Sequence, residues 1–255
     1  MDKKFLNYIN SISNTKAKLI CFPFAGGSVS AFREWKNEVS EFVELCLVQL
    51  PGRENRINEE PIRRLSKLVI QLADELEPII KDNNEYFFFG HSMGALISYE
   101  LTREIRKRGW QMPKKIFVSG KNAPHIKKSS KNSPTYNLPK DEFINKIREM
   151  NGTPEEVLQN IEIMELYLPI LRADFEIVDT FDYKNGDILD CPIVAFCGVE
   201  DPLTEPSDVE LWGELTNGDF TTHYFLGDHF YLLQRENRKS LIQIINNELS
   251  IEQVK

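Results

Sequence analysis

The chain has 255 residues, of which 41% are hydrophobic and 27% are charged, and these values suit one large α/β domain with a sizeable buried core. Its formal net charge of −8 argues against bulk binding to nucleic acid. No apolar run approaches the roughly 20 residues that cross a bilayer, and Asn7 interrupts the apolar stretch near the N-terminus. We therefore expect a cytoplasmic protein without a signal peptide or a membrane partner, and we expect a monomer.

The first part of the chain alternates apolar strand-like runs with one helical pattern. Residues 18–22, 45–50 and 86–89 are almost continuously apolar, which is typical of strands buried on both faces of a mostly parallel sheet. Between the second and third runs, apolar residues recur at helical spacing from Pro61, a favourable first-turn residue, to Leu76. This alternation predicts an α/β fold with helices on either side of the sheet.

The most informative residue is Ser92, in the sequence Gly90-His91-Ser92-Met93-Gly94 directly after the third apolar run. A serine at a sharp strand-to-helix turn adopts strained backbone angles, and glycines on either side relieve the crowding. Such a turn lifts the hydroxyl clear of the sheet edge and places the next N–H at the start of a helix, where it can stabilise an oxyanion. We therefore predict that Ser92 is a nucleophile rather than an ordinary turn serine.

A helix and a further strand are expected after this turn. Ile97, Leu101 and Ile105 share one face at helical spacing, and Gly109 stands where a helix stop is expected. Residues 116–119 then predict the next buried strand.

The alternation stops between residues 123 and 190. Three prolines interrupt a lysine-rich loop, and helical patterns follow without a clear strand. Phe143 belongs to one amphipathic group, Thr153 and Pro154 are typical of a helix N-cap and first helical position, and residues 164–171 supply a broad apolar surface. A helical insertion late in such a sheet predicts a lid over the crevice at the carboxyl ends of the strands. A second small domain or plain packing helices are the alternatives.

The last part of the chain returns to the earlier pattern. Residues 193–197 and 222–225 predict strands, and residues 241–249 carry the spacing of a final helix. The loops that follow these two strands contain the remaining candidates for a serine-based active site.

A serine hydroxyl needs a base, and the chain has only four histidines. His91 adjoins Ser92, but adjacent strand residues point to opposite faces, so we expect it to be a poor base. His125 lies in the proline-rich loop, and His223 lies inside a predicted strand. His229 stands in a loop just after the last predicted strand, where the base of this architecture belongs. We predict that His229 is the base.

The acid that orients this base should lie between the serine and the histidine in chain order. Asp201 has the best position, because it lies in the turn after the strand at 193–197. Glu200 is the adjacent alternative, and Asp228 is expected to be a solvated neighbour of the histidine.

The oxyanion formed by serine attack needs a second backbone donor besides the N–H of Met93. Residues 22–27, Phe-Pro-Phe-Ala-Gly-Gly, follow the first predicted strand, and their glycines allow the main chain to approach a ligand closely. Ala25 is the preferred donor and Phe24 the alternative. A tight turn that merely requires glycine is the other interpretation of this loop.

The four cysteines lie singly in or beside apolar segments, so we expect reduced core thiols rather than a disulfide framework. Their spacing matches no common zinc site, and we predict no metal site. These residues are Cys21, Cys46, Cys191 and Cys197.

With these residues in view, the chain resembles the type II thioesterases of the α/β-hydrolase superfamily, the stand-alone editing enzymes of non-ribosomal peptide and polyketide synthesis. The resemblance extends from about Leu19 to Leu233. It rests on CFPFAGG at 21–27, LPGRE at 50–54, GHSMGA at 90–95, LPILRAD at 168–174 and GDHFYL at 227–232. The first two segments and the Leu-Arg-Ala-Asp sequence discriminate better than the serine turn, which many unrelated esterases share. Asp228 departs from the family, which often has glycine before its histidine.

The resemblance implies a single α/β-hydrolase domain over residues 1–255, with residues 123–190 as a helical lid. It also implies hydrolysis of acyl thioesters on the phosphopantetheine arm of carrier domains, which clears misprimed or stalled synthases. Ser92 would attack the thioester carbonyl, His229 would take the serine proton, and Asp201 would fix the imidazole. The phosphopantetheine arrives with the carrier domain, so no cofactor of the enzyme itself is expected.

Two groups of residues outside this chemistry have open roles. Arg53 and residues 168–174 are expected to be structural or to belong to the lid. A lysine group either meets an acidic carrier domain or forms a solvated loop. This group contains Lys121, Lys127, Lys128 and Lys131.

Three rival functions share parts of this pattern. A carboxylesterase or lipase would use the same residues on oxygen esters, and a chain-releasing enzyme would use them on fatty-acyl or polyketide thioesters. A non-catalytic binding protein on the same fold would be expected to lack one of the three catalytic residues, and candidates for all three are present here.

Overall fold

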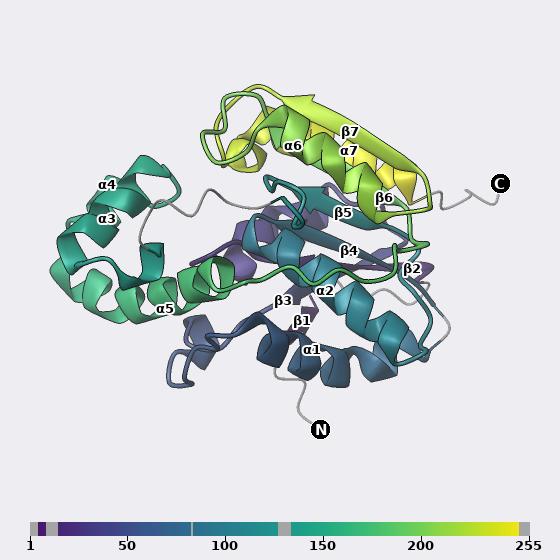
Figure 1. Ribbon diagram of the computed structural model, residues 1–255, viewed down its shortest axis with the longest axis horizontal. Helices are drawn as coiled ribbons and strands as arrows, with labels where there is room; N and C mark the ends of the chain where they lie inside the picture. Colours follow the sequence, from purple (N-terminus) through teal and green to yellow (C-terminus); the bar gives the residue numbers. More distant parts are fainter. Residues whose placement is uncertain (1–4, 9–14, 83, 127–133, 250–255) are drawn as a thin grey trace.

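The computed structural model describes residues 5–8, 15–82, 84–126 and 134–249 (Figure 1). A seven-stranded sheet in the order β1-β3-β2-β4-β5-β6-β7 forms its centre. All neighbouring pairs are parallel except β1 with β3. The strands are β1 (Leu6–Tyr8), β2 (Ala17–Phe22), β3 (Val43–Val48), β4 (Glu85–His91), β5 (Ile116–Ser119), β6 (Ile193–Gly198) and β7 (Phe220–Phe225).

The mostly parallel sheet flanked by helices is confirmed, and the six predicted strands all occur. The three-residue strand β1 was not predicted, because three residues are too short to show an alternating pattern. It pairs antiparallel with β3 and so occupies one edge of the sheet.

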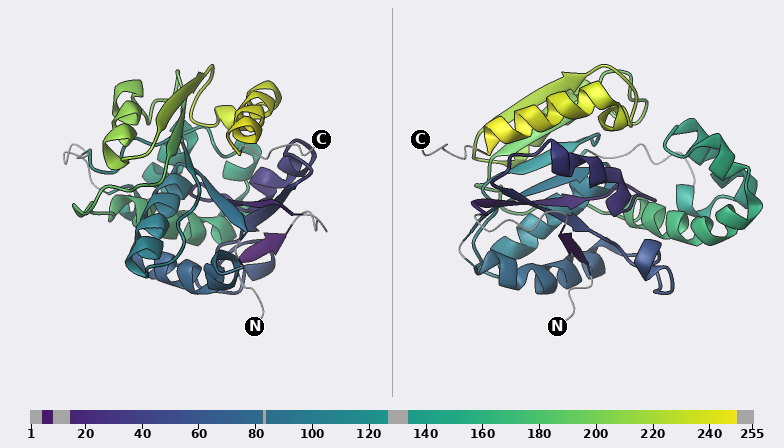
Figure 2. Two further views of the ribbon diagram at one scale, coloured as in Figure 1. Left: turned by 90° about the vertical axis from the view of Figure 1, so that its right-hand side faces the viewer. Right: turned by 180° about the vertical axis from the view of Figure 1, so that it is seen from behind.

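Two helical layers cover the sheet (Figure 2). Alternate strand residues point to opposite faces, so Ile20 packs in one apolar core while its neighbour Leu19 packs in the other. The first core includes α1 (Leu65–Ile80) and α2 (Met93–Lys107), and the second includes α7 (Arg235–Glu248). Shorter elements complete the chain: α6 (Pro206–Glu210) and the 3₁₀ helices η1 (Val29–Asn37), η2 (Glu54–Arg56), η3 (Thr135–Asn137), η4 (Leu211–Leu215) and η5 (Tyr231–Leu233).

The strand register brings the loops of interest to one edge. Phe22, the last residue of β2, pairs with Gly90 near the end of β4, and Gly198 at the end of β6 pairs with Phe225 at the end of β7. Because these strands are parallel, the loops that follow them leave the sheet on the same side. The serine turn and the loops that carry Asp201 and the last histidine therefore share the carboxyl edge.

Two predicted helix starts were wrong. Helix α1 begins at Leu65 rather than Pro61, because Pro61 belongs to the preceding loop and packs against Gly52. Helix α4 begins at Glu155, and the extended ψ of 142° at Pro154 keeps that residue at the N-cap, so Thr153 lies outside the helix. A proline next to a helix start is compatible with several cap positions, so its presence does not fix the first helical residue.

Within the described residues, three α-helices lie between β5 and β6 in the sequence, and they extend beyond one end of the sheet (Figure 1). They are α3 (Lys140–Glu149), α4 (Glu155–Leu158) and α5 (Ile161–Asp179). The described part of this segment contains no strand, as predicted. It has an apolar cluster of its own, separate from the two cores on the sheet, formed by Phe143, Ile147, Leu158, Met164, Leu168 and Leu171. No described helix is long and apolar enough to span a membrane.

Candidate active site

Ser92 lies at a sharp turn between β4 and α2. Its backbone has φ 54° and ψ −109°, a strained conformation for a residue with a side chain. The two glycines are required by close backbone approach: a Cβ on Gly90 would lie 2.0 Å from the Gly94 carbonyl oxygen, and one on Gly94 would lie 2.1 Å from that of Phe22. The Ser92 N–H donates to the Ser119 carbonyl at 2.8 Å, which fixes the turn against β5.

His229 and Asp201 form a buried hydrogen-bonded pair. The distance between His229 Nδ1 and Asp201 Oδ2 is 2.6 Å, and their side chains are 4% and 0% exposed. Asp201 also accepts hydrogen bonds from the Thr204 hydroxyl and the Leu203 N–H, both at 2.8 Å. The carboxylate is thereby fixed from three directions, and it holds the imidazole with Nε2 available for a second partner.

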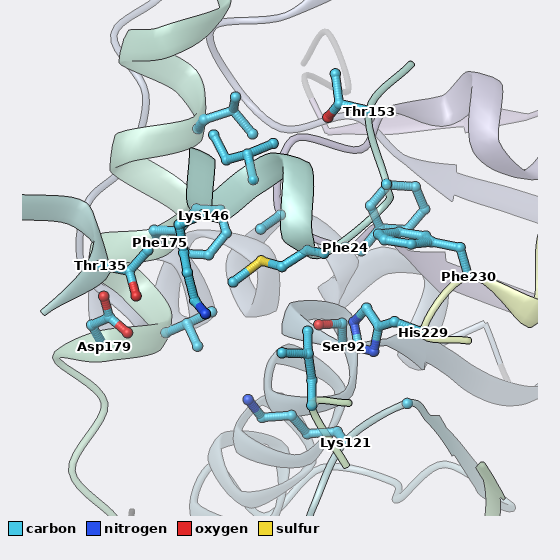
Figure 3. A pocket seen from close by; sticks show the side chains of 18 of the residues that line it. Phe24, Ser92, Lys121, Thr135, Lys146, Thr153, Phe175, Asp179, His229 and Phe230 are labelled. Carbon is cyan, nitrogen blue, oxygen red and sulfur yellow. The ribbon is translucent and has the colours of Figure 1, made fainter. Parts of the chain in front are cut away.

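Ser92 and His229 line the same cavity, which has a volume of about 260 Å³ (Figure 3). The surrounding side chains come from two parts of the chain. Phe24, Lys121 and Phe230 belong to loops at the sheet edge, whereas the apolar side opposite comes from α3 and α5. The residues of that apolar side are Ile147, Leu171, Phe175 and Val178. The structure therefore brings the predicted nucleophile and base to one cavity.

The two segments that carry the predicted oxyanion donors are in contact with each other. Gly94 packs against the carbonyl of Phe22, so the start of α2 touches the loop that follows β2. Met93 is the first residue of α2, and its N–H has no carbonyl partner within the helix. Ala25 and Phe24 line the cavity, and within the described ranges their N–H groups donate to no other residue. These groups are available to a bound oxyanion.

His91, expected to be a poor base, packs directly against the His229 ring. The two ring centroids are 4.9 Å apart, and His91 Nδ1 lies 2.8 Å from the Ser119 hydroxyl. Ser119 in turn lies 2.6 Å from the hydroxyl of Tyr231. Burial, and secondarily the neighbouring His229, hold the pKa of His91 well below its usual range, so His91 stays neutral. Sequence reasoning missed this supporting network, since its three members are far apart in the chain.

The other titratable candidates lie outside the cavity lining. His125 pairs with Glu214 at 3.1 Å, and the His223 ring stacks on Phe196 inside the sheet region. Glu200 is exposed, and within the described part of the chain the side-chain hydrogen bond of His229 is to Asp201 rather than to Glu200. Asp228 is not merely solvated, because it accepts a hydrogen bond from the Asn151 side chain at 2.9 Å.

All four cysteines are buried, and none of them is in a disulfide bond. Burial raises the pKa of the Cys21 and Cys197 thiols, and it raises that of Cys191 to about 12. Across residues 5–8, 15–82, 84–126 and 134–249, no group of three or more His, Cys, Asp or Glu side chains is arranged to hold a metal ion.

The sequence matches the family model of the thioesterase domain over residues 17–249. The chain belongs to the thioesterase family. Among its curated relatives, it is 41% identical to the gramicidin S biosynthesis protein GrsT of Aneurinibacillus migulanus, over 98% of this chain and 95% of the relative. It is 33% identical to the medium-chain S-acyl fatty acid synthase thioesterase of Rattus norvegicus, over 92% of this chain and 89% of that enzyme.

Solved thioesterases show the same fold. The type II thioesterase BorB from the borrelidin biosynthetic cluster superimposes with a TM-score of 0.86 at 32% identity, covering 96% of this chain and 97% of BorB. The α/β-hydrolase fold and the resemblance to type II thioesterases are thus both confirmed for this family member.

Proposed function

We propose that this thioesterase is a stand-alone editing enzyme that removes acyl groups from the phosphopantetheine arm of carrier domains in non-ribosomal peptide or polyketide synthesis. The observation that carries this proposal is the buried His229–Asp201 pair in a cavity shared with Ser92. These residues provide a nucleophile, a base and an orienting acid in a family of thioester hydrolases. Similarity to GrsT and BorB along almost the whole chain favours peptide and polyketide synthesis as the setting.

The proposed reaction uses acyl transfer to serine and then to water. Ser92 attacks the thioester carbonyl while His229 takes its proton, and the N–H groups of Met93 and Ala25 hold the oxyanion. The tetrahedral intermediate expels the pantetheine thiol, which receives the proton from His229. His229 then deprotonates a water molecule, which attacks the acyl-enzyme. The ester bond to Ser92 Oγ breaks, the imidazolium returns its proton to that oxygen, and the acid is released. Asp201 stabilises the imidazolium formed in each half of the cycle.

We also propose that residues 123–190 act as a lid within one domain. Helices α3 and α5 supply the apolar side of the cavity opposite Ser92, so movement of this segment changes access to the serine. Gly152 lies against the Phe230 ring, where an added Cβ would be only 2.2 Å from a ring carbon. This close packing supports a position of the segment directly over the loop that carries the base.

The carrier domain brings the phosphopantetheine, so the enzyme needs no cofactor of its own in this proposal. We propose that it acts in the cytoplasm as a monomer, with no membrane or nucleic-acid partner. Lys121 lines the cavity, and we propose that it contacts an incoming carrier domain. The other lysines of that predicted contact, Lys127, Lys128 and Lys131, lie outside the described residues.

The experiment that tests this function is intact-mass analysis of carrier domains loaded with acetyl or aminoacyl groups. We expect wild-type enzyme to return both carriers to the free thiol, while Ser92→Ala leaves them loaded. Failure of the wild type to clear either carrier, combined with rapid hydrolysis of simple oxygen esters, would favour the carboxylesterase alternative instead.

Release of fatty-acyl chains is the second candidate, favoured by the similarity to the rat medium-chain enzyme. It uses the same three residues and differs in the acyl group. A carrier loaded with a medium-chain acyl group, assayed beside the acetyl and aminoacyl carriers, separates the two. Faster release of the medium chain by an order of magnitude or more would favour the second candidate.

A further inference from the structure

We infer that the buried ion pair between Arg53 and Asp174 is a positioning device that holds the loop of residues 23–27, here called the oxyanion loop, in register with Ser92. This inference rests on the proposed hydrolase function and adds a role for two residues outside the triad. Arg53 lies between β3 and η2, whereas Asp174 lies on α5, so the pair joins the sheet, the oxyanion loop and the helical segment.

The contacts of Asp174 show how the loop is held. Its Oδ2 accepts the N–H of Gly26 at 2.7 Å, and the Arg53 guanidinium donates to both carboxylate oxygens at 2.8 and 2.9 Å. The same Arg53 Nη1 donates to the Gly27 carbonyl at 2.9 Å. Both sides of Gly26 are therefore tied, one residue after Ala25 and its proposed donor N–H. The residues of the ion pair are 4% and 1% exposed.

Helix α5 holds the oxyanion loop at a further point. The Tyr167 hydroxyl donates to the Gly26 carbonyl, and Leu171 lies one helical turn further on, so close that a Cβ on Gly26 would be 2.6 Å from its Cδ2. The φ of Gly26 is 77°, a backbone conformation that favours glycine, so both this angle and the contact with Leu171 require glycine at this position. Tyr167, Leu171 and Asp174 thus form one stripe of α5 against the loop.

Stability alone is a poor explanation for this pair. Removing two charges from water has a large cost, and apolar residues of similar volume often replace a buried ion pair without loss of stability. The Arg53 Nε is also buried without a hydrogen-bond partner among the described residues, which adds to the cost. The ion pair instead provides directional hydrogen bonds. A bidentate guanidinium and a carboxylate fix the orientation of the peptide planes in the loop, which apolar side chains cannot do. An oxyanion donor needs such fixed geometry, because its contribution depends on distances near 3 Å.

The test replaces the pair by apolar residues, Arg53→Met with Asp174→Leu, so that no buried charge is left unpaired. A second variant, Asp174→Asn, keeps the shape and removes the charge. The matched control is Glu176→Gln: Glu176 lies on the same helix two residues later and pairs with Arg63 and Arg64, away from the oxyanion loop. Urea unfolding of each variant reports whether the fold is retained.

Two readouts follow the oxyanion loop without requiring a carrier domain. The first is kcat and KM for p-nitrophenyl acetate. The second is the affinity for a trifluoromethyl ketone relative to that for the corresponding methyl ketone. The trifluoromethyl ketone forms a tetrahedral adduct with the serine, whereas the methyl ketone resembles the ground state. These probes react at Ser92 even if carrier thioesters are not the substrates. Failure of the positioning role of the ion pair and failure of the editing function therefore remain distinguishable.

We expect the double variant to fold with near-wild-type stability. Its kcat should fall by about 10- to 100-fold with little change in KM. Its affinity for the trifluoromethyl ketone should fall by a similar factor, whereas its affinity for the methyl ketone should not change. Asp174→Asn should show the same selective loss, and Glu176→Gln should keep both values within about twofold. A folded double variant with wild-type kcat and inhibitor affinity overturns the inference. So does an equal loss in Glu176→Gln, which would mean that any loosening of α5 has this effect.

Discussion

The two sides of the cavity are built in different ways. On the Ser92 side, each catalytic candidate follows a parallel strand of the sheet and is fixed by buried hydrogen bonds. On the opposite side, α3–α5 have a small apolar cluster of their own and reach the rest of the molecule partly through polar contacts. From this difference we expect that the reacting groups are rigidly placed, whereas the opposite side of the cavity rests on a segment that can open locally.

The largest effect is expected from the rigid side. Ser92→Ala and His229→Ala each remove a group that no neighbour replaces, so kcat should fall by about 10⁵- to 10⁶-fold in a folded protein. Stopped assays on a loaded carrier domain measure the residual rate, and circular dichroism checks the fold. Near-full activity in His229→Ala would remove this residue from the mechanism.

Asp201→Asn should lower kcat by about 10⁴-fold, somewhat less than the loss of the base. The amide keeps the shape, but it can donate its own N–H toward His229 Nδ1 and favour the wrong imidazole tautomer. Glu200→Gln is the control, because Glu200 is the adjacent exposed acid. If Glu200→Gln is the more damaging change, the assignment of the acid moves to that residue.

Packing mutations compare the two sides directly. Phe89→Ala opens a cavity in the sheet core and should lower the global free energy of unfolding by about 3–5 kcal/mol. Phe143→Ala removes an equally buried ring from the cluster of α3–α5. We expect faster hydrogen exchange confined to α3 and α5, measured by exchange mass spectrometry. The global free energy of unfolding, measured by urea unfolding, should change less than in Phe89→Ala. Equal global losses would show that both sides unfold as one unit.

The smallest effect is a pH dependence from His91. Its pKa is held below the unfolded value of about 6.5, so only the unfolded chain takes up this proton as the pH falls below that value. The free energy of unfolding should therefore decrease toward acid by up to about 1.4 kcal/mol per pH unit, down to the folded pKa. Urea unfolding at pH 7.5, 6.5 and 5.5 gives this slope. Identical slopes in wild type and His91→Gln would refute it.

The sequence predicted well which candidate residues lie together, because glycine, serine and strand-end positions carry local signals. The turn at Ser92 has two glycines that close backbone contacts require, and Asp201 and His229 each follow a predicted strand. Element boundaries were less well predicted: Pro61 and Thr153 were assigned to helix starts that lie further along the chain.

Contacts between distant residues could not be predicted from one sequence. Arg53 and Asp174 are 121 positions apart in the chain. Their sequence segments helped to identify the family but did not indicate that the two side chains form an ion pair. His91 was set aside as a base because of strand alternation, which says nothing about the ring of His229 that packs against it. Such pairings depend on the tertiary arrangement of several elements, which a single sequence does not show.

The burial of all four cysteines has a consequence for an enzyme whose proposed product is itself a thiol. Released pantetheine could form a mixed disulfide with a reactive cysteine under oxidising conditions. Cys21, Cys46 and Cys197 are 0% exposed and Cys191 is 3% exposed, so no thiolate is presented to the departing arm. A disulfide reagent that reports free thiols by colour should therefore follow turnover continuously, with little background from the folded enzyme.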